Sequence, residues 1–186
     1  MTTFFDQAFP IEQVRHDTPG VAEVIHFNNA GSALSPQVVV DTVVSHLHRE
    51  AAIGGYEASD EAHDRLEAVY QSIARLIGAQ PNQIAIIENA TRAWDMAVYG
   101  YPFEPGDRVL TCRAEYSSNV IALLQLQKRH GLEIVLIDDD ETGQIDLKHL
   151  DQELARGATM LCMTHAPTSG GLINPAEEVG ALCNAY

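Results

Sequence analysis

The sequence predicts an α/β fold, an αβα sandwich around a largely parallel sheet. Apolar runs of strand type begin at residues 84, 108, 133 and 159, so their starts lie 24, 25 and 26 residues apart. A stretch suited to a helix follows each run before the next one begins. Two neighbouring parallel strands must be joined by a crossover connection of about a dozen residues or more, which is usually a helix. This even alternation therefore indicates successive strand–helix–strand crossover units.

The second half of the chain supplies these crossover units in order. The strands are expected at residues 84–87, 108–111, 133–137 and 159–164. The helices are expected to begin near Thr91, to span residues 117–130 and 147–155, and to open at Pro175. Gly131 directly follows the second of these helices, and glycine commonly ends helices in the left-handed conformation.

The first part of the chain has a different rhythm. Residues 1–20 contain prolines and are expected to form an irregular amino-terminal arm, and residues 24–27 are expected to form a short strand. Ser35 and Pro36 predict a helix start, and Gly54 and Gly55 predict its end. A second helix is expected over residues 59–77, where apolar residues recur at spacings of three and four: Ala62, Leu66, Val69, Ile73 and Leu76.

The length of 186 residues suits one domain, or one domain with a small appendage. We expect an arm over residues 1–20 and one domain over residues 21–186. In the second crossover unit the helix start at 117 precedes the next strand start at 133 by 16 residues, and the same gap after 175 gives a further strand near 191. The pattern therefore predicts a sheet that is incomplete in this chain. A complete four-stranded domain that ends in a helix is the alternative.

Composition excludes several classes of function. Eleven basic residues against 26 acidic ones give a formal charge of -15, which argues against nucleic acid because such binding needs a basic surface. No apolar stretch approaches the roughly 18 residues of a membrane span, and no secretory signal is visible. The three separated cysteines and the His46 and His48 pair favour neither a disulfide framework nor a metal site, so a reducing cytoplasm fits best.

Three loops that follow predicted structural elements carry groups suited to binding. Asn89, Ala90 and Thr91 open a helix whose amino end can bind a phosphate, although such residues also serve as ordinary helix caps. Tyr116 follows the second strand and Thr168 the fourth, so both are expected at the carboxyl edge of the sheet. Together the loops indicate a site for an aromatic ligand that carries a phosphate. Gly-x-Gly-x-x-Gly, Walker and Gly-x-Ser-x-Gly motifs are absent from the sequence, which disfavours nucleotide-binding and serine-hydrolase classes.

Six segments in order resemble the class V aminotransferase family of fold-type I pyridoxal-phosphate enzymes. This family includes cysteine desulfurases, selenocysteine lyases, isopenicillin N epimerase-like proteins and ergothioneine-pathway C–S lyases. The segments are Phe-Asn-Asn-Ala-Gly at 27–31 with Leu-Ser-Pro at 34–36, Glu-Asn-Ala-Thr at 88–91, Gly-Asp-Arg-Val-Leu at 106–110, Glu-Tyr-Ser-Ser-Asn at 115–119, Gly-Gln-Ile-Asp at 143–146 and Thr-His-Ala-Pro-Thr-Ser-Gly-Gly at 164–171. The resemblance implies the large domain of such an enzyme and its cofactor, pyridoxal 5'-phosphate.

The resemblance also implies roles for individual residues. Cofactor binding falls to Asn89, Ala90, Thr91, Tyr116 and Thr168, and contact with the substrate carboxylate falls to Ala30 and Gly31. Two of these positions depart from the family pattern. Tyr116 replaces a ring-stacking histidine. The ordinary pKa of tyrosine is about 10 and that of histidine about 6.5, so a tyrosine does not shuttle protons at neutral pH as a histidine does. Thr168 replaces an asparagine and so lacks the amide donors.

The family's Schiff-base lysine is expected beyond the point that matches Tyr186. The chain has two lysines, Lys128 and Lys148, both in predicted helices away from the binding loops. We therefore expect this chain to be the amino-terminal part of an enzyme that acts on amino acids or amino-acid-derived sulfur compounds. The chain itself is expected to have no catalytic residue and to be inactive alone. The resemblance implies a homodimer in the complete enzyme. The alternatives are a non-catalytic module that binds phosphate compounds or pairs with a second chain that supplies the lysine, and a nucleotide-binding domain.

Overall fold

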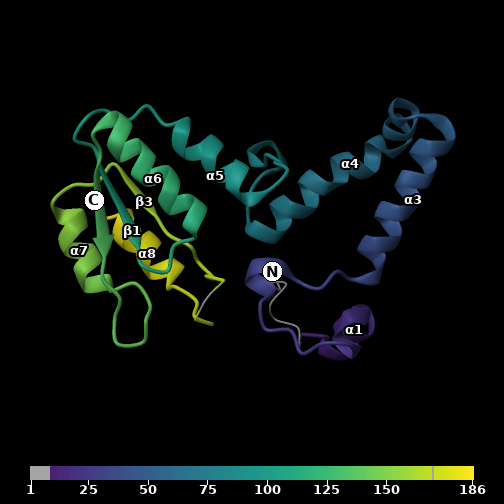
Figure 1. Cartoon of the computed structure of the whole chain (residues 1–186), viewed down its shortest axis with the longest axis horizontal. Helices are drawn as coiled ribbons and strands as arrows, with labels where there is room; N and C mark the ends of the chain where they lie inside the picture. Colours follow the sequence, from purple (N-terminus) through teal and green to yellow (C-terminus); the bar gives the residue numbers. More distant parts are fainter. Residues whose placement is uncertain (1–8, 169) are drawn as a thin grey trace. The chain divides into compact units, whose positions relative to one another are not determined.

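The computed structural model describes residues 9–168 and 170–186, and the chain divides into two compact units between Ile86 and Ile87 (Figure 1). Residues 1–8 of the expected arm lie outside the described residues. The expected arm over residues 1–20 and domain over residues 21–186 stay a prediction.

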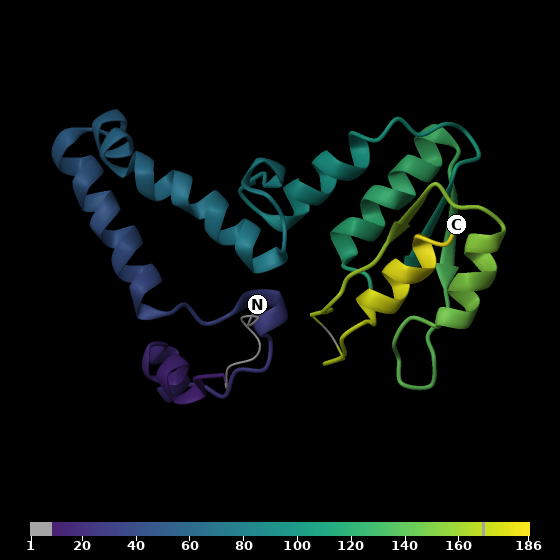
Figure 2. The same cartoon turned by 180° about the vertical axis from the view of Figure 1, so that it is seen from behind.

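The first unit is helical. It contains the helices α1 (Ile11–His16), α2 (Asn29–Ser32), α3 (Gln37–Ile53) and α4 (Gly55–Ile77) and the 3-10 helices η2 (Pro19–Ala22) and η3 (Pro81–Gln83). Helices α3 and α4 form a hairpin that turns at Gly54 (Figures 1 and 2), whose φ of 103° favours glycine because that region penalises a Cβ atom. The predicted end of the first long helix at this glycine is confirmed.

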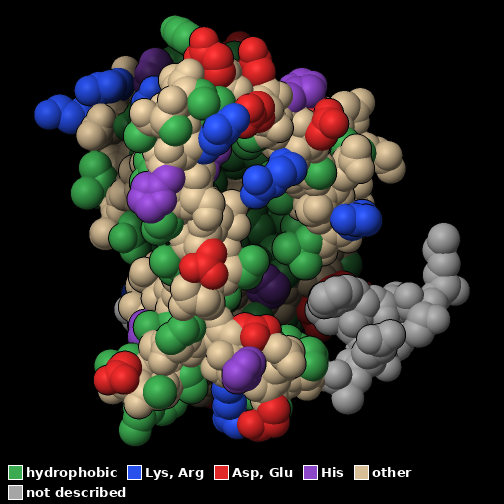
Figure 3. All heavy atoms as spheres, turned by 90° about the vertical axis from the view of Figure 1, so that its right-hand side faces the viewer, with side chains coloured by type: hydrophobic (Ala, Val, Ile, Leu, Met, Phe, Trp, Pro, Cys, Tyr) green, Lys and Arg blue, Asp and Glu red, His purple; other side chains and the backbone are tan. Residues whose placement is uncertain are grey.

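Most large apolar side chains of the first unit are exposed. Among its described residues, Ala58 and Ala74 alone are buried apolar side chains. The surface view in Figure 3 accordingly shows hydrophobic side chains lying open among charged ones. Helix α3 contributes a large share of the exposed apolar residues: Val38, Val39, Val40, Val43, Val44 and Leu47.

The strand expected over residues 24–27 is wrong. This segment is irregular, and the side chains of Ile25 and Phe27 are 88% and 94% exposed. An apolar run forms a strand only when the backbone of a neighbouring segment pairs with it. The described part of the chain provides no such neighbour for this segment.

The second unit is an α/β layer structure, as predicted. It contains helices α5 (Ala90–Tyr99), α6 (Ser117–His130), α7 (Leu147–Ala155) and α8 (Ala176–Cys183) and strands β1 (Arg108–Cys112), β2 (Glu133–Ile137) and β3 (Met160–Cys162). The strands form a parallel sheet in the order β2-β1-β3, with Thr111 level with Leu136 on one side and with Cys162 on the other. The carboxyl ends of β1 and β3 therefore lie side by side.

Helices cover both faces of this sheet. On one face, Leu110 and Cys112 of β1 pack with Leu150 of α7 and Val179 of α8. On the opposite face, Val109 and Cys162 pack with Val98 of α5 and with Leu123 and Leu126 of α6. Since neighbouring residues of a strand point to opposite faces, Cys112 and Cys162 lie in different clusters although their strands are adjacent. The αβα arrangement is confirmed.

The strand expected over residues 84–87 is wrong, so the described sheet has three strands and not four. The run Ile84, Ala85, Ile86 and Ile87 contains the division between the two units and pairs with no described strand. No helix among the described residues is long and apolar enough to cross a bilayer.

Candidate functional site

The first part of the candidate site is the amino end of α5. Asn89 caps this helix, since its side-chain oxygen accepts a hydrogen bond from the backbone N–H of Arg92 at 2.9 Å. The first N–H groups of any helix have no partner within the helix, so those of Ala90 and Thr91 are the groups that an anion would meet there. Thr91 Oγ1 lies 3.1 Å from Ser118 Oγ, which ties the start of α5 to the start of α6.

The second part is a pocket of about 330 Å³ at the carboxyl ends of β1 and β3. It is lined by two loops, one after each strand: Arg113, Ala114, Glu115, Tyr116, Ser117, Thr164, Pro167 and Thr168. The predicted residues Tyr116 and Thr168 therefore line one pocket although 52 positions separate them in the sequence. Tyr116 is 51% exposed, which leaves part of its ring accessible to a ligand.

Of the predicted residues of the second unit, Tyr116 and Thr168 share a pocket, and Thr91 is linked to its neighbourhood by one contact. Thr91 reaches the pocket region through Ser118, the neighbour of the pocket residue Ser117. The other two candidates, Ala30 and Gly31, lie in α2 of the first unit, where Asn28 caps the helix by accepting a hydrogen bond from Gly31 N–H at 3.1 Å. The pocket described above is built from residues of the second unit alone.

A hydrogen-bond network that the sequence analysis missed surrounds this pocket. Glu115 Oε1 accepts hydrogen bonds from Thr164 Oγ1 and from Asn119 Nδ2, the latter at 2.9 Å. On its other side, the Thr164 carbonyl accepts a hydrogen bond from Asn174 Nδ2 at 2.7 Å, and the buried Asn174 accepts one from Ile145 N–H at 3.0 Å. The only sequence signal was that Glu115 and Thr164 begin two of the motifs that resemble the family.

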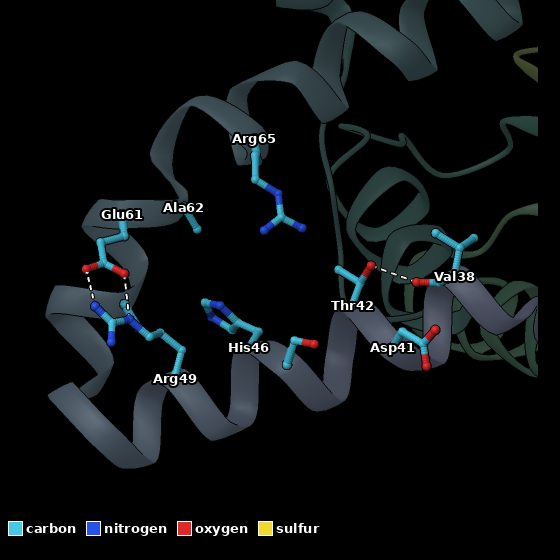
Figure 4. Close-up of a pocket in the computed structure, with 10 residues that line it drawn as sticks. Val38, Asp41, Thr42, His46, Arg49, Glu61, Ala62 and Arg65 are labelled. Atoms are coloured by element: carbon cyan, nitrogen blue, oxygen red, sulfur yellow. Dashed lines mark hydrogen bonds and ion pairs between the residues drawn. The ribbon is translucent and has the colours of Figure 1, made fainter.

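A second and larger pocket lies in the first unit between α3 and α4 (Figure 4). Its volume is about 510 Å³, and the Arg49 guanidinium at its end forms a bidentate ion pair with Glu61 at 2.6 and 2.7 Å. His46 and Arg65 point into the space between the helices (Figure 4). We place the candidate site in the smaller pocket, because only that one joins predicted loops at the carboxyl edge of a parallel sheet.

Metal ligands are not grouped in either pocket. Within residues 9–168 and 170–186, no group of three or more His, Cys, Asp or Glu side chains is placed to hold a metal ion. His46 of the larger pocket contacts Glu50 at 3.4 Å, four residues further along α3.

We expect a thiol reagent at neutral pH to modify Cys183 and to spare Cys112 and Cys162. Burial raises the pKa of all three thiols, and the nearby Glu115 carboxylate adds to this at Cys112 and Cys162, so that the pKa of Cys162 rises to about 12. The thiolate is the reactive form, and Cys183 is the exposed cysteine of the described residues. Mass spectrometry would count the modified thiols, and Cys183→Ser should abolish labelling of the native chain. Labelling of Cys112 or Cys162 before unfolding would contradict the expectation.

The geometry fits a phosphate-bearing aromatic cofactor. A helix start with a threonine hydroxyl lies beside a pocket whose wall carries an accessible tyrosine ring and threonine hydroxyls. The pocket volume of about 330 Å³ lies at the lower end of the range of roughly 300–1,000 Å³ for small-molecule sites.

Curated relatives of this chain are cysteine desulfurases. The chain is 28% identical over 176 residues to a probable cysteine desulfurase of Pyrococcus abyssi, an alignment that covers 92% of this chain and 44% of the relative. It is also 28% identical over 191 residues to a cysteine desulfurase of Pectobacterium atrosepticum, with 96% of this chain and 47% of the relative covered. The chain thus spans less than half the length of these relatives.

Solved structures agree with these relatives. The apo cysteine desulfurase of Thermococcus onnurineus superposes with a TM-score of 0.81 at 27% identity, covering 96% of this chain and 46% of that one. A C-DES mutant, solved with glycine covalently linked to its pyridoxal-phosphate cofactor, has the same TM-score at 21% identity and covers 92% and 46% of the two chains, which shows a shared fold. The family model for class-V aminotransferases matches residues 25–186. With its fold, its pocket and this match, the chain belongs to the class-V aminotransferase family.

Proposed function

We propose that this chain is the cofactor-binding amino-terminal part of a pyridoxal-phosphate enzyme that acts on amino acids or amino-acid-derived sulfur compounds. Its reaction class is that of C–S lyases and desulfurases, with transamination as the related alternative. The observation that carries the proposal is the pocket shared by the loops after β1 and β3, beside the capped start of α5. Family membership, together with a neighbour linked to the cofactor, indicates pyridoxal phosphate as the group to be bound.

The residues have separate tasks in this proposal. The amino end of α5, with the Thr91 hydroxyl and the N–H groups of Ala90 and Thr91, binds the phosphate, and Asn89 fixes that helix end. Tyr116 stacks on the pyridine ring, and Thr168 donates to or accepts from the ring oxygen. The backbone of Ala30 and Gly31 contacts the substrate carboxylate. When bound, the cofactor supplies an electron sink for negative charge at the amino-acid carbon.

Tyr116 and the lysines limit what this chain does alone. A tyrosine holds the ring by stacking, yet it does not exchange a proton at neutral pH as a histidine would. Lys128 lies in the last turn of α6 and Lys148 in the first turn of α7, and both are exposed and absent from the pocket lining. A covalent tether for the cofactor needs a lysine amine at the pocket. We therefore propose that the chain binds the cofactor without the tether and without turnover.

The direct test is to purify the chain with pyridoxal phosphate, treat it with borohydride and digest it for mass spectrometry. We expect a change in the cofactor absorbance on binding, no cofactor fixed to Lys128 or Lys148, and no release of sulfide or pyruvate from cysteine. A lysine-linked cofactor together with amino-acid turnover would contradict the inactive state. No binding at any cofactor concentration that leaves the chain folded would contradict the binding function.

Thr91→Ala is expected to weaken pyridoxal-phosphate affinity by roughly 10- to 100-fold, since a hydrogen bond to a charged phosphate is worth about 1.5–3 kcal/mol. The change also removes the contact between Thr91 Oγ1 and Ser118 Oγ. Thr91→Ser keeps the hydroxyl and should retain most of the affinity in a fluorescence titration of Trp94, which lies one turn into the same helix. Equal affinity in the alanine and serine variants would place the phosphate elsewhere.

A non-catalytic module that pairs with a second, lysine-bearing chain remains the second candidate, favoured by the exposed positions of both lysines. Activity that arises only on mixing with such a chain would support it. A homodimer and a cytoplasmic location stay expectations, the first from the resemblance and the second from the cysteine pattern.

A further inference from the structure

One oxygen atom of Glu115 collects three hydrogen bonds from three different segments. Glu115 Oε1 accepts from its neighbour Tyr116 N–H at 2.7 Å, from Asn119 Nδ2 in the first turn of α6 at 2.9 Å, and from Thr164 Oγ1 after β3. Hydrogen bonds to an ionised acceptor are roughly twice as strong as those between neutral groups. The carboxylate is therefore the node that joins the loop after β1, the start of α6 and the loop after β3.

The second oxygen of Glu115 has a different environment. Among the described residues Glu115 Oε2 has no hydrogen-bond partner, and the atom is buried. Burial of a polar atom without a hydrogen-bond partner costs free energy. Hydrogen bonding at Oε2 therefore does not account for the position of this side chain. It is explained by the three donors that meet at Oε1.

The three donors fix the two walls of the candidate pocket. Tyr116 lies on one wall, and the segment from Thr164 to Thr168 forms the other. Thr164 is held from its far side as well, because its carbonyl accepts from Asn174 Nδ2. The spacing between the walls thus depends on a polar chain that runs from Asn119 through Glu115 and Thr164 to Asn174.

We propose that Glu115 is a positioning residue that sets the distance between the ring-facing Tyr116 and the threonine-bearing loop after β3. The proposal deepens the proposed function and rests on it for the identity of the ligand between the two walls. Glu115 does not touch the reacting atoms. It holds the pocket open to one width, so that a flat ring fits between the tyrosine and the Thr164–Thr168 segment.

Hydrogen–deuterium exchange of the full chain tests this role without any cofactor. Glu115→Ala should accelerate exchange in residues 163–168 and 113–119 by about tenfold or more, because loss of the shared acceptor frees both loops to open locally. Glu115→Gln keeps an acceptor at the same place and should exchange nearly as the native chain does. Thr164→Val removes only the bond across the pocket and should accelerate exchange in residues 163–168, which provides a second variant if Glu115→Ala fails to fold. Glu141→Ala removes the same charge from an exposed loop and should leave both segments unchanged.

A titration with pyridoxal phosphate separates this role from the proposed function. We expect the native chain to bind, Glu115→Ala to bind about tenfold more weakly, and Glu115→Gln to bind with near-native affinity. That result would support both the cofactor-binding function and the positioning role of Glu115. If the native chain does not bind, the proposed function fails, and the exchange results still decide whether Glu115 positions the loops. Unchanged exchange in both Glu115→Ala and Thr164→Val, or equal acceleration in Glu115→Gln and Glu115→Ala, would overturn the positioning role.

Discussion

Arg108→Met is expected to lower the free energy of unfolding of the second unit by about 3–5 kcal/mol. The Arg108 guanidinium donates to the Glu153 carboxylate, to Glu133 Oε1 at 3.2 Å and to the carbonyls of Glu153 and Gly157. The side chains of Arg108 and Glu153 are 14% and 10% exposed, so methionine would leave a largely buried carboxylate with less of its compensating charge. Urea unfolding followed by circular dichroism would measure the loss.

Arg113→Met is the matched control, since Arg113, directly after β1, also pairs with a carboxylate, that of Asp138 directly after β2. Its partner Asp138 is 57% exposed, and an ion pair at the surface contributes little to stability. Equal losses of unfolding free energy in Arg108→Met and Arg113→Met would contradict this account.

The buried pair of Arg108 and Glu153 also predicts a pH dependence. Burial acts to raise the pKa of Glu153, but hydrogen bonds from Arg108 and Arg156 hold this pKa below its usual 4.5. The contribution of Glu153 to stability is therefore present above pH 4.5 and is lost as the pH falls through its lowered pKa.

Leu123→Ala is expected to cost about 2–5 kcal/mol of unfolding free energy, and its neighbour Leu124→Ala no more than about 0.5 kcal/mol. The two leucines are adjacent on α6, yet Leu123 is 1% exposed and Leu124 is 52% exposed. Leu123 packs with Val98 of α5, so a cavity there also loosens the helix whose amino end carries Thr91. Thermal unfolding of both variants measures the difference.

The same pair of variants links packing to the site. We expect Leu123→Ala to weaken pyridoxal-phosphate binding even under conditions where the chain stays folded, because α5 and α6 meet at Thr91 and Ser118. Leu124→Ala should bind as the native chain does. Similar stability losses from both leucines would contradict the packing of α6, in which Leu123 is buried and Leu124 is exposed.

Helices with clear end signals were predictable from the sequence, whereas isolated apolar runs were not. The helix over residues 117–130 is confirmed to the residue, since Gly131 ends it with a φ of 72°. The helix over residues 147–155 is likewise confirmed, and Asp146 caps it by accepting from Lys148 and His149 N–H. Residues 24–27 and 84–87 have strand composition but no pairing neighbour, and pairing depends on distant backbone that local composition does not encode.

The loops of the candidate site were predictable for a related reason. Parallel strands with helical crossovers bring their carboxyl ends to one edge, so Tyr116 and Thr168 could be expected near each other. The hydrogen bond from Thr164 to Glu115 spans 49 positions of sequence, and nothing local to either residue indicates it. Asn174 was missed because a buried side chain that joins two backbone segments looks like any loop asparagine in the sequence.

The alternation of side chains along β1 has a consequence for how this protein responds to oxidants. Cys112 and Cys162 come from neighbouring strands, but one thiol points toward α7 and α8 and the other toward α5 and α6. A disulfide needs Cβ atoms about 3.5–4.5 Å apart with converging directions, which a sheet forbids across its own thickness. Loss of reductant should therefore form disulfides between molecules through Cys183 and no disulfide within the sheet. Non-reducing gels would then show dimers that depend on this exposed thiol.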